Sequence, residues 1–163
     1  MRLLIIRHAI AVARETPGIP DTDRPLTEEG EAKFREAARG LARLVDSPDA
    51  LLTSPWLRAA QTARIAGEAW GKIQPMETEV LAGGSFEEQA AVLDGYPESA
   101  TVAVVGHEPY VSALLARLLG SKQEDRLTFK KGGAALVEVP GRLADGGQLL
   151  WFLPPKVLRK LGG

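Results

Sequence analysis

The two histidines of the chain each follow an apolar run that is typical of a buried strand. His8 comes after Leu3–Ile6 and Arg7, and His107 comes after Thr101–Val105 and a single glycine. Sites in parallel sheets form outside the carboxyl ends of the strands, so we expect the two imidazoles to lie close together. One histidine at a strand end is most simply a hydrogen-bonded structural residue. Two at equivalent positions indicate a functional site.

Arginines accompany both histidines, and they determine what the site can bind. Arg7 precedes the first histidine, and Arg58 lies one helical turn beyond a third predicted strand end, at Ser54. Histidines that hold a metal ion need further carboxylate or histidine ligands, whereas guanidinium groups repel a cation. Arginine instead presents a rigid fork that matches the oxygens of phosphate, and the helix N-termini predicted after Ser54 and Glu108 add backbone donors. The pattern predicts a phosphoryl site with no metal and no cofactor.

The composition excludes several other classes of protein. With 163 residues, of which 45% are hydrophobic and 25% charged, the chain is expected to form one domain over residues 1–163. A net charge of -1 gives no indication of nucleic-acid binding, and the absence of cysteine rules out a thiolate nucleophile. No apolar run is long enough for a membrane span, and Arg7-His8 interrupts the short apolar start, which therefore does not resemble a signal peptide. We expect a cytoplasmic protein without a membrane partner.

The elements that must position the site alternate between strand and helix. Buried strands are predicted at Leu3–Ile6, Ala50–Thr53, Thr101–Val105, Ala134–Val139 and Gln148–Leu153, with a further short strand after Lys72. Helices are predicted from Thr27 to about Val45, from Ser54-Pro55 to about Gly71, at Phe86–Leu93, from Pro109 through Leu118, and in the basic tail Pro154–Gly163. This order predicts a three-layer α/β/α sandwich around a mostly parallel central sheet.

Four motifs of the chain resemble those of the histidine phosphatase superfamily, which includes the phosphoglycerate mutases. Leu4–Ala9 resembles the Arg-His-Gly signature, and Asp23–Thr27 with Gly30 resembles the next motif. Ser54–Ala63 is similar to the third motif and Val105–His107 to the fourth. The motifs come in the family order and span the first three quarters of the chain. Together they are far more specific than an Arg-His pair alone.

Within the superfamily the sequence is most similar to the small SixA-like phosphohistidine phosphatases. Ala9 replaces the usual glycine, the fourth motif reads Gly106–Pro109, and the chain is short and closes with Trp151–Pro154. The resemblance implies a phosphoglycerate mutase-like fold and a reaction that passes through a phosphohistidine enzyme intermediate on His8. It also implies that no cofactor takes part.

The implied mechanism assigns a role to each of four residues. His8 must be neutral at the attacking nitrogen, and the charges of Arg7 and Arg58 should lower its pKa. The other ring nitrogen of His8 should donate to a backbone carbonyl, which fixes the tautomer. Arg7, Arg58 and His107 would bind the equatorial oxygens of the phosphoryl group and stabilise the charge of the transition state.

Two further polar residues have two interpretations each, and a third has one. Ser54 is either the N-cap of the helix that follows it or a contact of the phosphate. Arg24 is either an ion-pair partner within its loop or a direct contact of the substrate. Thr27 is most simply the cap of the first helix.

A general acid is harder to find in the sequence. Many relatives use a glutamate from a longer insertion between the second and fourth strands, and this region is short here. Glu79 and Glu108 are the candidates, although each is more simply explained as a surface carboxylate or, for Glu108, as a helix cap. An imidazole leaving group is a weaker base than an alkoxide and needs less help from an acid. A missing acid therefore favours phosphohistidine as the substrate, and an open site admits a phosphoryl group carried by a protein.

Three functions remain open at this point. The first is dephosphorylation of phosphohistidine in a protein partner, and the second is a broad phosphomonoesterase or mutase that acts on small phosphorylated metabolites. The third is a non-catalytic module that binds phosphate. Basic residues near the C-terminus either steer an acidic partner or form an ordinary solvated face: Lys130, Lys131, Lys156, Arg159 and Lys160.

Overall fold

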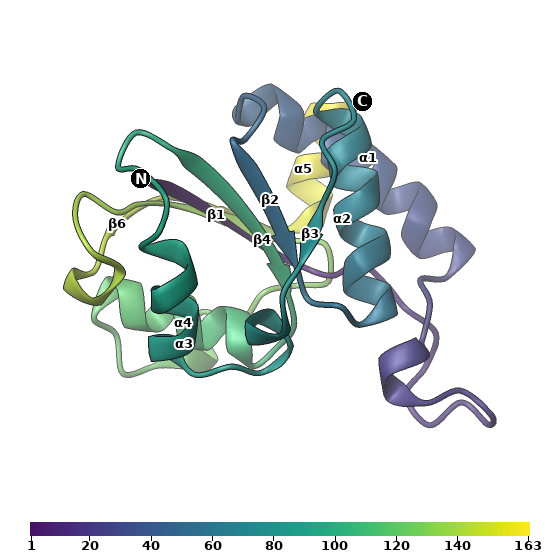
Figure 1. Cartoon of the computed structure of the whole chain (residues 1–163). Coiled ribbons are helices and arrows are strands. Elements are labelled where there is room, and N and C mark those ends of the chain that lie inside the picture. The colour runs from purple at the N-terminus through teal and green to yellow at the C-terminus, as the bar shows by residue number, and fades with distance from the viewer.

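The computed structural model describes all 163 residues and contains one sheet of six strands (Figure 1). The strands lie in the order β3-β2-β4-β1-β5-β6. β1, β2, β3 and β4 run parallel to one another, whereas β5 and β6 are antiparallel to their neighbours. Their bounds are Arg2–Arg7 for β1, Ala50–Thr53 for β2, Met76–Glu77 for β3, Thr101–Gly106 for β4, Ala134–Glu138 for β5 and Gln148–Leu153 for β6. The predicted mostly parallel sheet is confirmed.

Five α-helices cover the two faces of this sheet. Their bounds are Glu28–Leu44 for α1, Leu57–Ala69 for α2, Phe86–Leu93 for α3, Tyr110–Leu119 for α4 and Pro155–Gly162 for α5. One buried apolar cluster joins the sheet to α1, α2 and α5, and a second joins it to α3 and α4. Figure 1 shows the two groups of helices on opposite sides of the strands, which is the predicted three-layer sandwich. No helix is long and apolar enough to cross a membrane.

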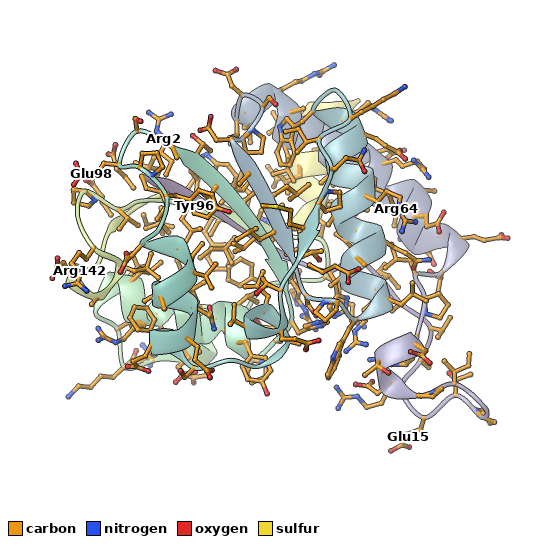
Figure 2. The ribbon with its side chains drawn as sticks, in the orientation of Figure 1. Arg2, Glu15, Arg64, Tyr96, Glu98 and Arg142 are labelled. Atoms are coloured by element: carbon orange, nitrogen blue, oxygen red, sulfur yellow. The ribbon has the colours of Figure 1, made fainter.

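β1 lies in the middle of the sheet and contributes to both clusters. Leu4 and Ile6 belong to the cluster beneath α1, α2 and α5, whereas Leu3 and Ile5 belong to the cluster beneath α3 and α4. All four side chains are completely buried, because side chains of a strand alternate between the two faces and both faces are covered. Charged side chains such as Glu15, Arg64 and Arg142 project from the surface (Figure 2).

The register of the three central strands brings the predicted site residues together. Arg7 pairs with Gly106 across β1 and β4, and Thr53 pairs with Val105 across β2 and β4. His8, His107 and Ser54 therefore each follow the end of an adjacent strand. The backbone continues the pairing there, since the His8 N–H donates to Gly106 O at 3.0 Å.

The helix predicted to begin at Ser54-Pro55 begins instead at Leu57, with Trp56 in the N-cap position. The Ser54 hydroxyl accepts from the Trp56 N–H at 3.2 Å, but the chain stays extended at Trp56, where ψ is 136°. The extended segment keeps Ser54 beside the fourth strand rather than on the helix, so the N-cap interpretation of Ser54 is wrong. By contrast, Thr27 caps α1 as predicted, because its side chain accepts from the Gly30 N–H at 2.9 Å.

Candidate active site

The two histidines lie side by side at the carboxyl edge of the sheet. Their ring centroids are 5.2 Å apart, with the rings tilted by 52°. His8 is only 6% exposed and His107 only 3%. Arg7 comes from the end of β1 and Arg58 from the first turn of α2. The predicted convergence of these four residues is present in the structure.

The hydrogen bonds of His8 define its tautomer. Its Nδ1 lies 2.7 Å from the backbone oxygen of Ala9, and a carbonyl oxygen only accepts, so Nδ1 must carry the proton. The lone pair of the ring is then on Nε2. Arg58 Nε lies 3.4 Å from this atom and donates to it. The predicted donation to a backbone carbonyl is found, and Nε2 is the ring nitrogen without a proton.

The pKa of His8 is lowered to about 3. Burial is the largest cause, and the hydrogen bond to Ala9 partly opposes it; the charges of His107, Arg58 and Arg7 lower the pKa further. The imidazole is therefore neutral at physiological pH. The two arginines act in the predicted direction, but the enclosure of the ring, which the sequence did not reveal, contributes more.

His107 is held by Ser54 and stacked beside Trp56. Its Nε2 lies 2.8 Å from Ser54 Oγ, and its ring centroid is 4.9 Å from that of Trp56. Burial, followed by the charge of Arg58, lowers the pKa of His107 to about 4. The other ring nitrogen, Nδ1, is buried and has no hydrogen-bond partner. A buried nitrogen without a partner is unusual and is available to a ligand oxygen.

Arg7 and Arg58 are each anchored by one backbone carbonyl. Arg7 Nη1 donates to Phe129 O at 2.6 Å, and Arg58 Nη1 donates to Asp21 O at 2.6 Å. Burial lowers the pKa of both guanidinium groups, but arginine still carries its charge at neutral pH. Arg7 Nε is buried without a partner, as is Nδ1 of His107. The site thus contains two unpaired buried nitrogens next to fixed positive charge.

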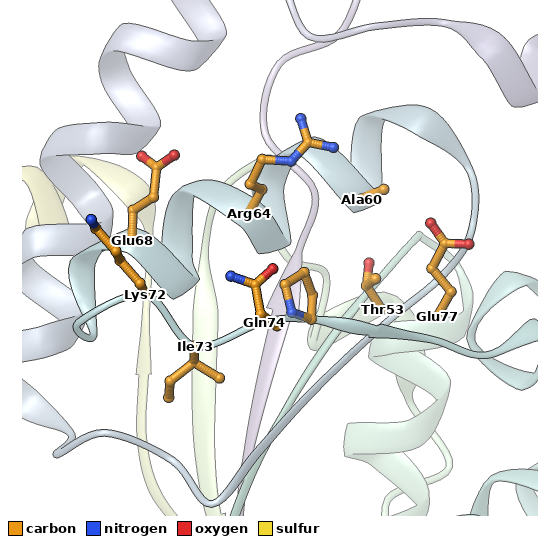
Figure 3. A pocket seen from close by; sticks show the side chains of 9 residues that line it. Thr53, Ala60, Arg64, Glu68, Lys72, Ile73, Gln74 and Glu77 are labelled. Carbon is orange, nitrogen blue, oxygen red and sulfur yellow. The ribbon is translucent and has the colours of Figure 1, made fainter.

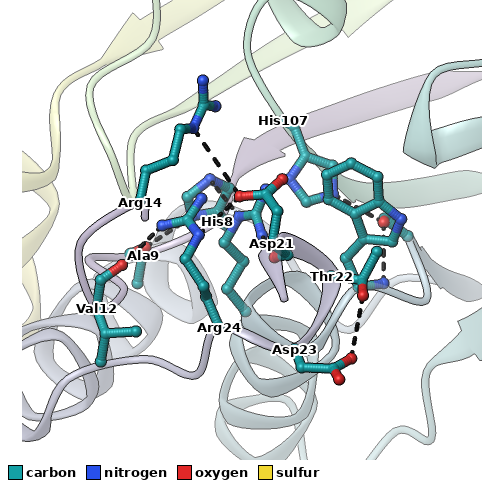
Figure 4. A network of polar contacts seen from close by, with 12 residues as sticks. His8, Ala9, Val12, Arg14, Asp21, Thr22, Asp23, Arg24 and His107 are labelled. Carbon is teal, nitrogen blue, oxygen red and sulfur yellow. Dashed lines mark hydrogen bonds and ion pairs between the residues drawn. The ribbon is translucent and has the colours of Figure 1, made fainter. Parts of the chain in front are cut away.

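These side chains line a cavity of about 250 Å³. Its wall is formed by Arg7, His8, Ala11, Val12, Ala13, Arg14, Arg24, Arg58, His107, Glu108 and Lys131. Four arginines and a lysine face one glutamate, so the cavity favours an anion. Nowhere do three or more side chains of the metal-binding types come together. Figure 4 shows part of the polar network around His8 and His107.

A separate cavity of about 510 Å³ lies between α2 and β3 (Figure 3). Arg64 and Lys72 line it together with Glu68 and Glu77, so its charges balance. It contains no histidine and no excess of positive charge. Size alone therefore does not identify the phosphoryl site, whereas the chemistry of the lining does.

The other predicted site residues differ in whether they line the cavity. Arg24 lines the cavity, but its Nε lies 2.8 Å from Asp21 Oδ1, so the predicted ion pair exists. Ser54 supports His107 and does not line the cavity. Glu108 lines the cavity, and its carboxylate accepts from the backbone N–H and the hydroxyl of Ser112 in the first turn of α4, whose N-cap residue is Pro109. Glu79 is exposed and lies outside the cavity, so the structure does not bring it to the site.

Asp21 and Trp56 are two contacts that sequence reasoning missed. Asp21 Oδ1 lies 3.9 Å from Arg14 and 2.8 Å from Arg24, and its Oδ2 lies 3.5 Å from Arg58. Trp56 packs against His107 and beneath the guanidinium of Arg58, 4.9 Å from the ring centroid. The sequence offered a weak signal for both, since Asp21 precedes the second motif and Trp56 lies within the third. Neither position reveals which way its side chain points.

Two histidines and two arginines thus lie together at the carboxyl edge of the sheet, around a cavity that favours an anion. A family model described as the histidine phosphatase superfamily, branch 1, matches residues 3–90. The chain belongs to this superfamily. An uncharacterised protein of Picosynechococcus is 34% identical over 136 residues, which cover 82% of each chain.

Solved structures show which members of the superfamily the chain is similar to. The protein histidine phosphatase SixA complexed with tungstate has a TM-score of 0.83 at 28% identity, over 97% of this chain and 99% of that one. A mycobacterial glucosyl-3-phosphoglycerate phosphatase has a TM-score of 0.76 at 17% identity, over 94% of this chain and 99% of that one, and shows the shared fold alone. The chain is therefore a SixA-like member of the superfamily.

Proposed function

We propose that the protein is a metal-independent phosphatase that removes the phosphoryl group from phosphohistidine in a protein partner, through an intermediate on His8. The observation that carries this proposal is the state of His8. Its Nδ1–H donates to Ala9 O, with 2.7 Å between the nitrogen and the oxygen, so the lone pair is on Nε2. The His8 ring lines a cavity that four arginines also line. Such a nitrogen is a neutral nucleophile in an anion-binding site.

The residues of the site support both halves of the reaction. Nε2 of His8 attacks phosphorus while the bond to the substrate imidazole breaks, and the leaving nitrogen keeps the electron pair and takes a proton from solvent. As His8 becomes positively charged, its Nδ1–H bond to Ala9 O strengthens. Arg7, Arg58 and His107 hold the equatorial oxygens. Water then attacks phosphorus, the bond to Nε2 breaks, and inorganic phosphate leaves.

We infer an imidazole leaving group because neither candidate glutamate is placed to act as a general acid. Glu108 lines the cavity, but Ser112 already occupies its carboxylate at 3.2 and 2.8 Å. Glu79 lies outside the cavity. A phosphate monoester releases a strongly basic alkoxide that needs a proton donor, whereas imidazole leaves more easily. The similarity of the chain to the protein histidine phosphatase SixA supports the same substrate class.

The basic surface beside the cavity supports the proposal that the phosphohistidine belongs to a protein. Lys131 lines both the phosphoryl cavity and a neighbouring hollow of about 60 Å³, which Lys33 and Arg159 also line. Lys131 and Arg159 are thus the two residues of the basic group near the C-terminus that lie close to the site. An acidic segment next to the phosphohistidine would meet positive charge there.

Trapping of the intermediate tests this function. Brief reaction with a phosphohistidine protein should leave acid-labile phosphate on His8, and His8→Ala should abolish both the labelling and turnover. The value of kcat/KM should be higher for a phosphohistidine peptide than for sugar phosphates, and EDTA should leave it unchanged. A preference for sugar phosphates would indicate the phosphomonoesterase or mutase instead. Unchanged turnover in His8→Ala would refute the nucleophile, and phosphate binding without any turnover would indicate a non-catalytic module.

A further inference from the structure

Arg58 is held from both sides, by the motif residue His8 and by Asp21, which lies outside the four motifs. On one side its Nε donates to the nucleophile His8, at 3.4 Å. On the other side its Nη1 donates to the backbone oxygen of Asp21 at 2.6 Å, and its Nη2 lies 3.5 Å from the Asp21 carboxylate. The Arg58 side chain is 3% exposed, so these contacts fix a buried guanidinium between the nucleophile and Asp21.

The same carboxylate holds a second arginine of the cavity. Asp21 Oδ1 accepts from Arg24 Nε at 2.8 Å, while Oδ2 faces Arg58. Arg24 Nη1 in turn donates to Val12 O at 2.7 Å, at the start of the loop that carries Asp21. Asp21 therefore links this loop to α2. It is the only acidic side chain paired with either arginine.

Asp21 makes these contacts from outside the cavity. Arg14, Arg24 and Arg58 all line the cavity, whereas Asp21 does not. Figure 4 shows the Asp21 carboxylate among the arginines of this network. The Asp21 carboxylate thus contacts arginines of the cavity without itself lining the cavity.

We propose that Asp21 is a positioning residue of the phosphoryl site: it orients Arg58 and Arg24, so that their free N–H groups face the phosphoryl oxygens. The proposal rests on the proposed function, since orientation of these donors matters to turnover only if the cavity binds a phosphoryl group. Preorganised donors contribute most where charge develops in the transition state. A small loss of their alignment should therefore affect the chemical step more than the binding of substrate.

The ionisation of Asp21 fits this role. Partial burial raises the pKa of its carboxyl group, but the hydrogen bond from Arg24 and the charges of Arg58, Arg24 and Arg14 outweigh that effect and lower it. The carboxylate is thus ionised at neutral pH and acts as an ionic anchor rather than as a proton donor.

The test compares two variants of Asp21 with a control variant in the same short turn. Asp21→Asn removes the charge but keeps the backbone oxygen that Arg58 contacts, and Asp21→Glu keeps the charge. Asp23→Asn is the control, because the Asp23 carboxylate contacts only the Thr22 hydroxyl. We would measure kcat and KM with phosphoramidate, and the affinity for vanadate by calorimetry. In Asp21→Asn, kcat should fall at least about 10-fold with a smaller change in KM, and vanadate should bind more weakly by a similar factor.

Asp21→Glu should recover part of the loss, and Asp23→Asn should match the wild type in both measurements. Tighter vanadate binding in Asp21→Asn would overturn the proposal, because it would mean that Asp21 competes with the phosphoryl group for the arginines. Unchanged kcat, or an equal loss in Asp23→Asn, would overturn it as well. Vanadate binding does not require turnover. The comparison of vanadate affinity between Asp21→Asn and Asp23→Asn therefore tests the role of Asp21 even if His8→Ala shows that the proposed function is wrong.

Discussion

Ser54 Oγ lies 2.8 Å from His107 Nε2 and is the only hydrogen-bond partner of the His107 ring. The contact joins the ends of β2 and β4, which pair in parallel. It leaves Nδ1 of His107 buried and unpaired, as the ring nitrogen available to a phosphoryl oxygen. The orientation of His107 therefore depends on one serine of the neighbouring strand end.

The first prediction concerns this serine. Ser54→Ala should lower kcat about 10-fold, because His107 loses the partner that fixes its ring and a buried polar atom without a partner costs about 1–3 kcal/mol. Steady-state kinetics with phosphoramidate would measure the loss, and thermal unfolding would show that the variant is folded. Ser47→Ala removes a serine whose hydroxyl bonds only to Trp70 O, far along the chain from the site, and should leave kcat unchanged. A wild-type kcat in Ser54→Ala would contradict the role of this contact.

The second prediction concerns the dependence of activity on pH. His8 must be unprotonated to attack, and its pKa is lowered to about 3, so acidification from pH 8 to pH 5 should leave the nucleophile intact. A profile of log kcat/KM, corrected for the ionisation of the substrate, should show no acid limb near the ordinary histidine pKa of about 6.5. An acid limb near pH 6.5 that moves with substitutions at Arg7 or Ala9 would contradict the buried, neutral state of His8.

The lowered pKa values of His8 and His107 predict that the folded protein loses stability in acid. In the unfolded chain they take up protons near pH 6.5, whereas in the folded protein their pKa values are about 3 for His8 and about 4 for His107. The unfolded state thus binds more protons between these values, and stability must fall as the pH falls through this window. Each histidine should contribute a slope of up to about 1.4 kcal/mol per pH unit to the free energy of unfolding. Urea unfolding of the wild type and of His107→Asn between pH 6 and pH 4.5 would measure it, and equal slopes would contradict the lowered pKa of His107.

The sequence predicted the sheet and the four converging residues because both depend on short-range patterns. Apolar runs define the buried strands, and both histidines closely follow such a run, so the parallel register brings His8 and His107 together. The start of α2 was misplaced because Ser54-Pro55 is a common helix start, while the contact that overrides it is with His107, which is distant in the chain. The role of Asp21 was missed for the same reason.

If the basic surface beside the cavity binds the protein substrate, loss of Arg159 should slow the reaction of a protein substrate but not that of a small one. Arg159→Gln should lower kcat/KM for a phosphohistidine protein about 3- to 10-fold and leave that for phosphoramidate unchanged, because Arg159 lines the hollow beside the cavity and not the cavity itself. Lys160→Gln, the exposed neighbour on α5, is the matched control. The difference between Arg159→Gln and the wild type should shrink as salt is raised. Equal losses with both substrates would show that Arg159 supports the fold or the cavity rather than a protein partner.

The last prediction concerns the contact between α1 and α5, which closes the sandwich at the C-terminus. A Cβ atom at Gly40 would lie 2.0 Å from Leu158 O, and one at Gly162 would lie 1.9 Å from Glu36 O, so the two helix backbones touch at their glycines. Alanine is normally favoured over glycine inside a helix by about 0.5–1 kcal/mol. Gly40→Ala should nevertheless destabilise the protein by at least about 2 kcal/mol, because neither backbone can move without disturbing the packing of the core. Glu36→Ala on the same helix keeps the backbone oxygen and should change the free energy of unfolding by less than about 1 kcal/mol. Urea unfolding of the two variants measures the difference, and a Gly40→Ala protein as stable as the wild type would show that α5 does not pack on α1 in this way.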